Sequence, residues 1–178
     1  MEHRLAIAFC LLAALAFVAP PPADAEPHAK PRDFRCLLKG KKVEGKNFYI
    51  FNRNRVRLRK AVAMTETGEI PPSGYPVGTV LQVLPFEAMI KRRPGYNPDG
   101  DNWEFVRLKV DPTTRKTTII ADGKGEVANP LGSCQACHAR LAPKFDLVCG
   151  FVIGANGLGL TDEQLAAIQA ADPRCKKK

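Results

Sequence analysis

Gly132-Ser133-Cys134-Gln135-Ala136-Cys137-His138 contains the most specific motif of this chain. A C-x-x-C-H run is the signature of covalent haem c attachment. Residues three and four apart share one face of a helical turn, so Cys134 and Cys137 can both reach the vinyl groups of one haem while His138 directs its imidazole to the iron. Ser133 is a suitable N-cap for that turn. The motif therefore predicts one covalent haem c, with His138 as the proximal iron ligand.

Three other interpretations of the two cysteines stay open. A thioredoxin-like redox pair requires a βαβ pattern, which the surrounding sequence lacks, and a zinc site requires a second paired set of ligands. The third interpretation is a disulfide, or free thiols, in a loop. The histidine directly after the second cysteine and an export signal at the N-terminus favour haem attachment over all three.

The first 25 residues have the pattern of a signal peptide. A basic start precedes an apolar run over residues 5–18, and Ala23-Asp24-Ala25 supplies small residues where a signal peptidase cuts. The run is too short to span a bilayer comfortably, and no later segment approaches spanning length. We therefore expect residues 1–25 to be removed, which leaves Glu26 as the first residue of a periplasmic protein. This agrees with the haem prediction, because c-type haem is attached on the export side of the membrane.

The mature chain is strongly basic. Removing Glu2, Arg4 and Asp24 with the signal peptide leaves 153 residues, of which 26 are basic and 16 acidic, a net charge of +10. This length suits one domain with one core. An exported protein rarely meets nucleic acid, so an acidic redox partner protein or an anionic surface is the better functional interpretation of this charge. A basic face that is merely solvated is the favoured alternative.

The mature chain divides into three segments. Residues 26–45 carry Pro, Lys and Arg with little apolar periodicity, and we expect a flexible basic arm there, with Cys36 in it. Residues 46–152 are expected to form a haem-binding β-rich domain, and residues 153–178 a C-terminal loop and helix. Apolar and β-branched runs predict strands at 46–51, 79–84, 86–91, 103–110 and 116–121. We therefore expect a mainly β (α+β) fold, with an antiparallel sheet and a few helices.

Two further patterns predict secondary structure at the ends of the domain. In residues 53–60, the arginines at 53, 55, 57 and 59 alternate with other residues, which predicts a strand with four charges on one face; residues 59–66 also tolerate a helix. Thr161-Asp162-Glu163-Gln164 is a capping box, which predicts the start of a helix that ends at Asp172-Pro173.

The second axial position of the iron decides what a haem in this chain does. His28, in the arm, is the only other histidine of the mature chain, and no methionine follows the haem motif. Met64 and Met89 are candidate ligands, although each is more often a core residue. Without such a ligand the iron has an open distal face, which binds small molecules. We expect sheet residues to line that face: Phe86, Met89, Trp103 and Phe105.

Several motifs in a fixed order carry a resemblance to a known family. Tyr75-Pro76-Val77-Gly78-Thr79-Val80-Leu81 is followed by Trp103-Glu104-Phe105, by the haem motif and by Asp146-Leu147-Val148. This order resembles the cytochrome P-460 family and its relative cytochrome c-prime-beta over residues 48–148. The resemblance implies an antiparallel β-sheet fold, commonly dimeric, that holds a His-ligated haem c with an open distal side. Members similar to this chain oxidise hydroxylamine, or bind nitric oxide without turnover.

The resemblance also directs attention to lysine and carboxylate side chains. The oxidising members bond a lysine covalently to the haem; here Val83 stands near the position where a lysine often occurs, and Lys91 lies further along. An enzyme would also need a group that moves protons near the distal iron. Glu87 and Glu104 are the candidates for that role, although an ordinary surface carboxylate is the favoured interpretation of each.

The mature chain has five cysteines, of which two belong to the predicted haem site. Cys36, Cys149 and Cys175 then permit one disulfide and leave one thiol. We expect Cys149–Cys175, which would close the C-terminal segment onto the haem segment and stabilise the fold by about 3 kcal/mol. The two pairings that use Cys36 stay open, as does an intermolecular bond through the odd thiol.

These observations predict a periplasmic cytochrome that binds or redox-converts a small nitrogen-oxide species, hydroxylamine or nitric oxide, at an open haem. The alternative is an electron-transfer cytochrome with Met89 or Met64 as the sixth ligand. A third hypothesis is an exported protein without haem, in which all the cysteines are structural.

Overall fold

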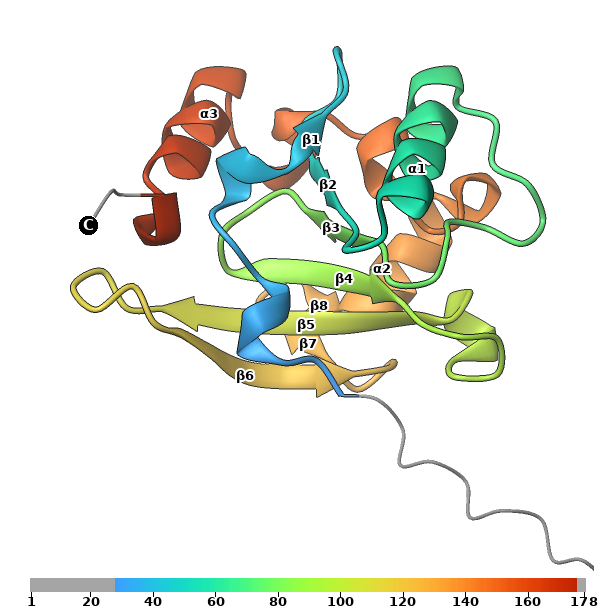
Figure 1. Ribbon diagram of the computed structural model, residues 1–178, viewed down its shortest axis with the longest axis horizontal. Coiled ribbons are helices and arrows are strands. Elements are labelled where there is room, and N and C mark those ends of the chain that lie inside the picture. Colours follow the sequence, from blue (N-terminus) through green and yellow to red (C-terminus); the bar gives the residue numbers. More distant parts are fainter. Residues whose placement is uncertain (1–27, 176–178) are drawn as a thin grey trace, which may run out of the picture.

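A six-stranded antiparallel sheet forms the centre of the fold. The structure, a computed structural model, describes residues 28–175, so the predicted signal peptide lies outside the described residues. The strands follow one another across the sheet in chain order, as β1 (Lys41–Lys42), β2 (Tyr49–Phe51), β3 (Val80–Gln82), β4 (Glu87–Lys91), β5 (Trp103–Val110) and β6 (Thr117–Gly123) (Figure 1). The prediction of a mainly β, antiparallel α+β fold is confirmed.

Three α-helices and a small hairpin complete the described part of the chain. The helices are α1 (Arg55–Thr67), α2 (Cys134–Leu141) and α3 (Asp162–Ala170), and the hairpin pairs β7 (Ala128–Asn129) with β8 (Gly132–Ser133). Short 3₁₀ helices connect these elements: η1 (Pro31–Asp33), η2 (Leu37–Lys39), η3 (Pro98–Gly100), η4 (Pro143–Phe145), η5 (Cys149–Phe151), η6 (Ala155–Leu158) and η7 (Pro173–Cys175). Within residues 28–175, no helix has the length and apolar character needed to cross a membrane.

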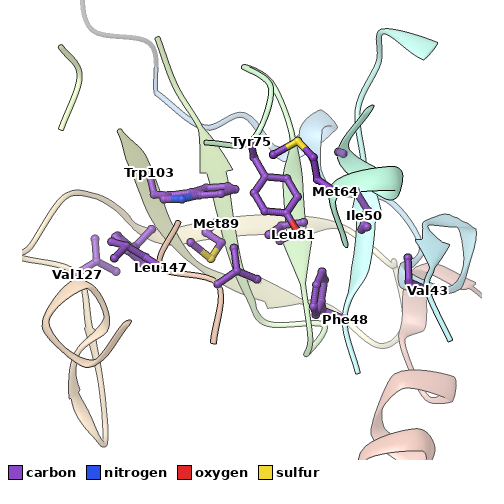
Figure 2. Close-up of a cluster of buried hydrophobic side chains, with 13 residues drawn as sticks. Val43, Phe48, Ile50, Met64, Tyr75, Leu81, Met89, Trp103, Val127 and Leu147 are labelled. Atoms are coloured by element: carbon purple, nitrogen blue, oxygen red, sulfur yellow. The ribbon is translucent and has the colours of Figure 1, made fainter. Parts of the chain in front are cut away.

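Both faces of the sheet are buried, because successive side chains of a strand point to opposite sides. Met89 of β4 and Phe105 of β5 join a core with Trp103. Figure 2 shows Met89 and Trp103 in this core. The neighbouring residues Ile90 and Val106 belong to a second core on the other face, which the N-terminal segment covers as it crosses the front of the sheet in Figure 1. Residues adjacent in sequence therefore serve different environments.

The segment predicted as an arginine-rich strand is instead the start of α1, and this prediction is wrong. Asn54 caps the helix, since its side-chain oxygen accepts hydrogen bonds from the amides of Val56 and Arg57, both at 3.0 Å. Gly68 ends the helix in the left-handed conformation, with φ +73°. Ala61 and Met64 of its buried face pack into the core. The alternating arginines are exposed, so their period of two had no packing to enforce it.

The segment expected to be a flexible arm packs against the sheet. Phe34 belongs to the second core, Leu37 is fully buried, and β1 adds an edge strand to β2. This arrangement corrects the expectation, and the reason is that the apolar residues of the segment cover a sheet face that would otherwise be exposed to water. The same segment holds Cys36 beside the C-terminus of the described chain.

The disulfide joins Cys36 to Cys175, which corrects the expected pairing of Cys175 with Cys149. Cys149 is a buried free thiol. The bond is favoured by the packing of η2 against η7 and α3, where the amide of Leu37 donates to Asp172 at 2.8 Å. The segments around Cys36 and Cys175, which are far apart in sequence, are therefore held together by packing as well as by the disulfide.

The C-terminal segment belongs to the same body as the sheet. The predicted capping box at Thr161 is confirmed, because its side chain accepts from the amide of Gln164 while that residue's side chain accepts from the amide of Thr161. Gln169 of α3 donates to the carbonyls of Asn47 and Val83, at 2.8 and 2.9 Å. These contacts place the segment beside the stretch that precedes β2 and the residue after β3.

Candidate functional site

A cavity lies between one face of the sheet, α2 and the C-terminal segment. Its empty volume is about 1060 Å³, including the part that is open to solvent. Residues of β3, β4 and β5 form one wall, the β7–β8 hairpin and α2 form another, and residues 148–158 contribute a third. Most of the lining side chains are apolar, as in cofactor sites generally.

The C-x-x-C-H motif opens into this cavity. The predicted helical turn is confirmed as α2, and Ser133 is its N-cap, accepting from the amide of Ala136 at 3.3 Å. The hydroxyl of Ser133 also donates to the carbonyl of Gly125 at 2.9 Å, which ties the start of the helix to the preceding turn. Cys134, Cys137 and His138 all line the cavity. The helix thus presents both thiols and the imidazole to one space, as the spacing predicted.

Both motif cysteines are free thiols and half-buried. Burial, and then the charge of Glu87, raises the pKa of Cys134. Cys149 also lines the cavity, and burial raises its pKa to about 12. Cys134, Cys137 and Cys149 thus form no disulfide with one another.

His138 is oriented by a backbone carbonyl. Its Nδ1 lies 2.7 Å from the carbonyl oxygen of Leu147. Because a carbonyl oxygen only accepts, Nδ1 must carry the proton, and in the neutral ring Nε2 then keeps a free lone pair. Burial lowers the pKa of His138, against the opposing effect of the Leu147 hydrogen bond, so the ring is neutral at pH 7. The edge-to-face contact with Phe105, at 5.3 Å between centroids, further limits how the ring can turn.

Two of the four residues expected in the distal pocket line the cavity, namely Met89 and Phe105. Phe86 does not line it and is 45% exposed, because it lies in the turn before β4. Trp103 is fully buried in the core, where its Nε1 donates to the carbonyl of Asp146 at 2.7 Å. Met64 is a core residue of α1 and is not part of the lining.

The two candidate carboxylates lie on opposite faces of the sheet. Glu87 lines the cavity, and its Oε1 accepts from Nδ2 of Asn129 at 3.1 Å. Glu104 is fully buried on the other face, paired with Arg92 and hydrogen-bonded by the amide of Ala29. Burial raises the pKa of Glu104 to about 7, against the effect of Arg92. Only Glu87 is therefore placed to act on a molecule in the cavity.

Val83 and Lys91, the two positions considered for a lysine bond, also lie in different environments. Val83 lines the cavity, whereas Lys91 is buried away from it in an ion pair with Asp146, with 2.5 Å between Nζ and Oδ1. No lysine is among the residues that line the cavity in the described chain. Neither position thus supplies a lysine side chain that could bond covalently to a molecule in this cavity.

His28 lies on the far face of the sheet from the cavity. Its Nδ1 is 3.1 Å from Oδ2 of Asp122, and together with Glu104 these residues bring ligand atoms within 4.8 Å of one another. The guanidinium of Arg92 already occupies the carboxyl group of Glu104, so a cation there would compete with this buried contact. His28 is not placed to be a second ligand for an iron near His138.

The donor set of the cavity fits a haem c. It combines two unpaired thiols at C-x-x-C spacing, a neutral imidazole with Nε2 free, and apolar walls. The motif itself predicted this convergence, whereas Asp146 and Leu147 were noted only for the family resemblance and the contact of the Leu147 carbonyl with His138 was not predicted. Comparisons of the chain with protein-family models, with curated proteins and with solved structures found no match.

Proposed function

We propose that this chain is a periplasmic monohaem c-type cytochrome, with the haem attached through Cys134 and Cys137 and with His138 as the proximal ligand. The convergence of these three side chains in one cavity carries the proposal. Haem c attachment requires two thiols and an axial donor within one helical turn, and α2 supplies them. The carbonyl of Leu147 holds the imidazole in the tautomer that leaves Nε2 free.

A haem bound there would supply an iron centre for small nitrogen-oxide ligands such as nitric oxide and hydroxylamine. The protein's own contribution is to shape and dry the site: Phe48, Met89 and Phe105 provide apolar walls that exclude water. Glu87 is the carboxylate of the lining, and Asn129 holds it in place. Glu87 is therefore the residue of the lining that would exchange a proton with a molecule bound in the cavity.

The residue at position 83 favours ligand binding over lysine-linked hydroxylamine oxidation. A valine there cannot form the covalent lysine bond of the oxidising members, and Lys91 is engaged by Asp146. We therefore propose nitric oxide binding as the leading activity of a cytochrome c-prime-beta type, with conversion of hydroxylamine as the alternative at the same site.

The proposal is tested by absorption spectra of the protein matured in a host that attaches c-type haem. We expect a Soret band that stays with the protein after acid acetone extraction, because the haem is covalently attached. The spectrum should be high-spin and should shift when nitric oxide is added. A Cys134→Ser/Cys137→Ser double variant is the negative control and should keep no haem absorption after extraction. A wild-type protein without any haem absorption would refute the proposal. A Soret band that is displaced far to the red on reduction would favour the lysine-linked oxidase.

Electron transfer is a second candidate, and the position of Met89 favours it. Met89 is the methionine of the described chain that lines the cavity, so it is the candidate for a sixth ligand. A ligated methionine gives a low-spin iron that ignores added nitric oxide. Met89→Leu preserves the apolar volume; it should convert a low-spin spectrum to high-spin if electron transfer is correct, and leave a high-spin spectrum unchanged if it is not.

The distribution of charge supports an acidic partner protein for that second function. Residues 30–60 contain twelve basic and two acidic residues. Their net charge of +10 equals the net charge of the whole mature chain. Six basic side chains line a groove between the N-terminal segment and α1, namely Arg35, Lys39, Lys41, Arg53, Arg57 and Arg92; of these, Arg53 pairs with Asp33 and Arg92 with Glu104. Such a concentration of like charge favours association with acidic surfaces.

Binding of a fluorescent poly-glutamate peptide at low salt tests the role of this groove. Lys39→Glu/Lys41→Glu should weaken binding at least roughly tenfold, since electrostatic steering is lost. Lys109→Glu/Lys116→Glu makes the same change of charge at exposed positions outside the groove and is the matched control. Equal loss in both variants would mean that net charge alone attracts the peptide and that the groove is not a docking site.

A further inference from the structure

A buried ion pair includes Asp146, the residue before the one whose carbonyl contacts His138. Nζ of Lys91 is 2.5 Å from Oδ1 of Asp146, each side chain is 5% exposed, and Nζ lies 5.0 Å from the centre of the Trp103 ring. Burying two charges is costly, and such a pair is poor evidence for stability in itself. The proposed haem site does not use either charge directly, so the pair requires a separate explanation.

Asp146 is held by three different parts of the chain. Besides Lys91 of β4, its Oδ2 accepts from the amide of Tyr75 at 2.7 Å, and its backbone carbonyl accepts from Nε1 of Trp103 at 2.7 Å. These partners come from the loop before β3, from β4 and from β5. The residue is therefore fixed at both its side chain and its backbone, more completely than a surface turn requires.

The turn that Asp146 fixes is strained. Asp146 and Leu147 have φ values of +51° and +59°, in the left-handed region that residues other than glycine rarely adopt. Strain of this kind persists only where surrounding contacts over-determine the backbone. The turn brings the amide of Leu147 to the carbonyl of Ala142 at the end of α2, at 3.1 Å, and its carbonyl to Nδ1 of His138, at 2.7 Å.

We propose that Asp146, held by Lys91, is the positioning residue for His138. It maintains the strained turn that presents the Leu147 carbonyl to Nδ1, and so sets the direction and the electron-donating strength of Nε2. The proposal deepens the haem function and rests on it only where His138 is an iron ligand. The orientation of the ring can be measured with or without haem.

Gly74 shows how closely the chain is built around this pair. A Cβ atom at Gly74 would lie 2.5 Å from both Oδ2 of Asp146 and Nζ of Lys91, and its φ of +66° is itself left-handed. Any side chain here would push the pair apart. Gly74→Ala should therefore displace Asp146 without removing a charge. It is a second, independent perturbation of the Lys91–Asp146 pair.

A second buried ion pair, which begins at the residue after Lys91, provides a matched control. Arg92 and Glu104 form another buried ion pair, on the opposite face of the sheet, and Glu104 anchors the amide of Ala29 instead of a turn near His138. Breaking it should cost stability in the same way as breaking Lys91–Asp146. A purely structural role for both pairs predicts equal consequences at His138, whereas the positioning role predicts a difference.

The first measurement uses the haem-free protein, labelled with ¹⁵N at its histidines, at one pH and temperature. Imidazole ¹H–¹⁵N spectra should show His138 protonated at Nδ1, with slow exchange of that proton. In Asp146→Asn and Gly74→Ala, we expect exchange to be roughly tenfold faster or more, or a mixed tautomer, because the carbonyl is no longer held. Glu104→Gln should leave the His138 signals as in the wild type.

The second measurement uses the haem-loaded protein. Loosening the Nδ1 hydrogen bond makes the imidazole a weaker donor, so Asp146→Asn and Lys91→Met should lower the iron–histidine stretching frequency and raise the reduction potential. Glu104→Gln should change neither. If Asp146→Asn does not fold, Lys91→Met and Gly74→Ala provide the comparison.

Unchanged His138 signals in folded Asp146→Asn and Gly74→Ala, or equal changes in Glu104→Gln, would overturn the proposal. A wild-type protein that takes up no haem would instead refute the proposed function. In that case the imidazole spectra would still decide whether Asp146 positions His138, so the two failures are distinguishable.

Discussion

Breaking the Cys36–Cys175 bond should lower the free energy of unfolding by about 5 kcal/mol. The bond spans a sequence separation of 139 residues. In the chain-entropy treatment, the constraint on the unfolded chain grows with the logarithm of loop length, which gives about 5 kcal/mol at 25 °C for a loop of this size. The pairing Cys149–Cys175 would close a loop of only about 26 residues and would stabilise by about 3.5 kcal/mol.

Urea unfolding of the Cys36→Ser/Cys175→Ser variant measures this difference. Both residues are changed together, so that no new free thiol is left to exchange with those of the cavity. With a denaturant slope of about 2 kcal/mol per M, the midpoint should fall by about 2.5 M. The hydrogen bond from the Leu37 amide to Asp172 remains in the variant and keeps the two ends in register.

Cys149→Ala is the control for this experiment, because Cys149 is buried but unbonded. It should cost about 1 kcal/mol, as expected for a small change in a buried side chain, and should leave the disulfide intact in a non-reducing peptide map. The reasoning is refuted if the double variant unfolds at the wild-type midpoint, or if Cys149→Ala removes the disulfide.

Two further predictions concern α1 and the far face of the sheet. Asn54→Ala should lower the free energy of unfolding by about 1 kcal/mol, since it removes the cap that Val56 and Arg57 use; the exposed Arg55→Ala is its control, and equal small effects in urea unfolding would contradict the cap. Burial raises the pKa of Glu104 from 4.5 to about 7, so the folded state keeps a proton that the unfolded state loses within this window. The free energy of unfolding should therefore fall as the pH rises from 4.5 to 7, by at most about 3 kcal/mol. Glu104→Gln should flatten that part of the pH profile, and an unchanged profile would show that another group is responsible.

Local signals in the sequence determined a large part of this structure. The cap at Ser133, the capping box at Thr161 and the strand at 103–110 depend on residues only a few positions apart. For the same reason the motif placed both thiols and the imidazole on one helical turn. The strand predicted at 53–60 failed because the alternating arginines are exposed, and the helix was set by its caps and by the burial of Ala61 and Met64.

Only the tertiary structure decided which distant residues meet. Glu87 and Glu104 have similar local sequence, yet strand register puts Glu87 in the cavity and Glu104 on the opposite face. Cys36 reaches Cys175 because the N-terminal segment packs beside α3, and the carbonyl of Leu147 reaches His138 because three distant segments hold Asp146. The physical reason is common to all of these. A residue's environment depends on the face its strand presents and on what covers that face, and both are set by contacts between parts of the chain too far apart for a local pattern to encode.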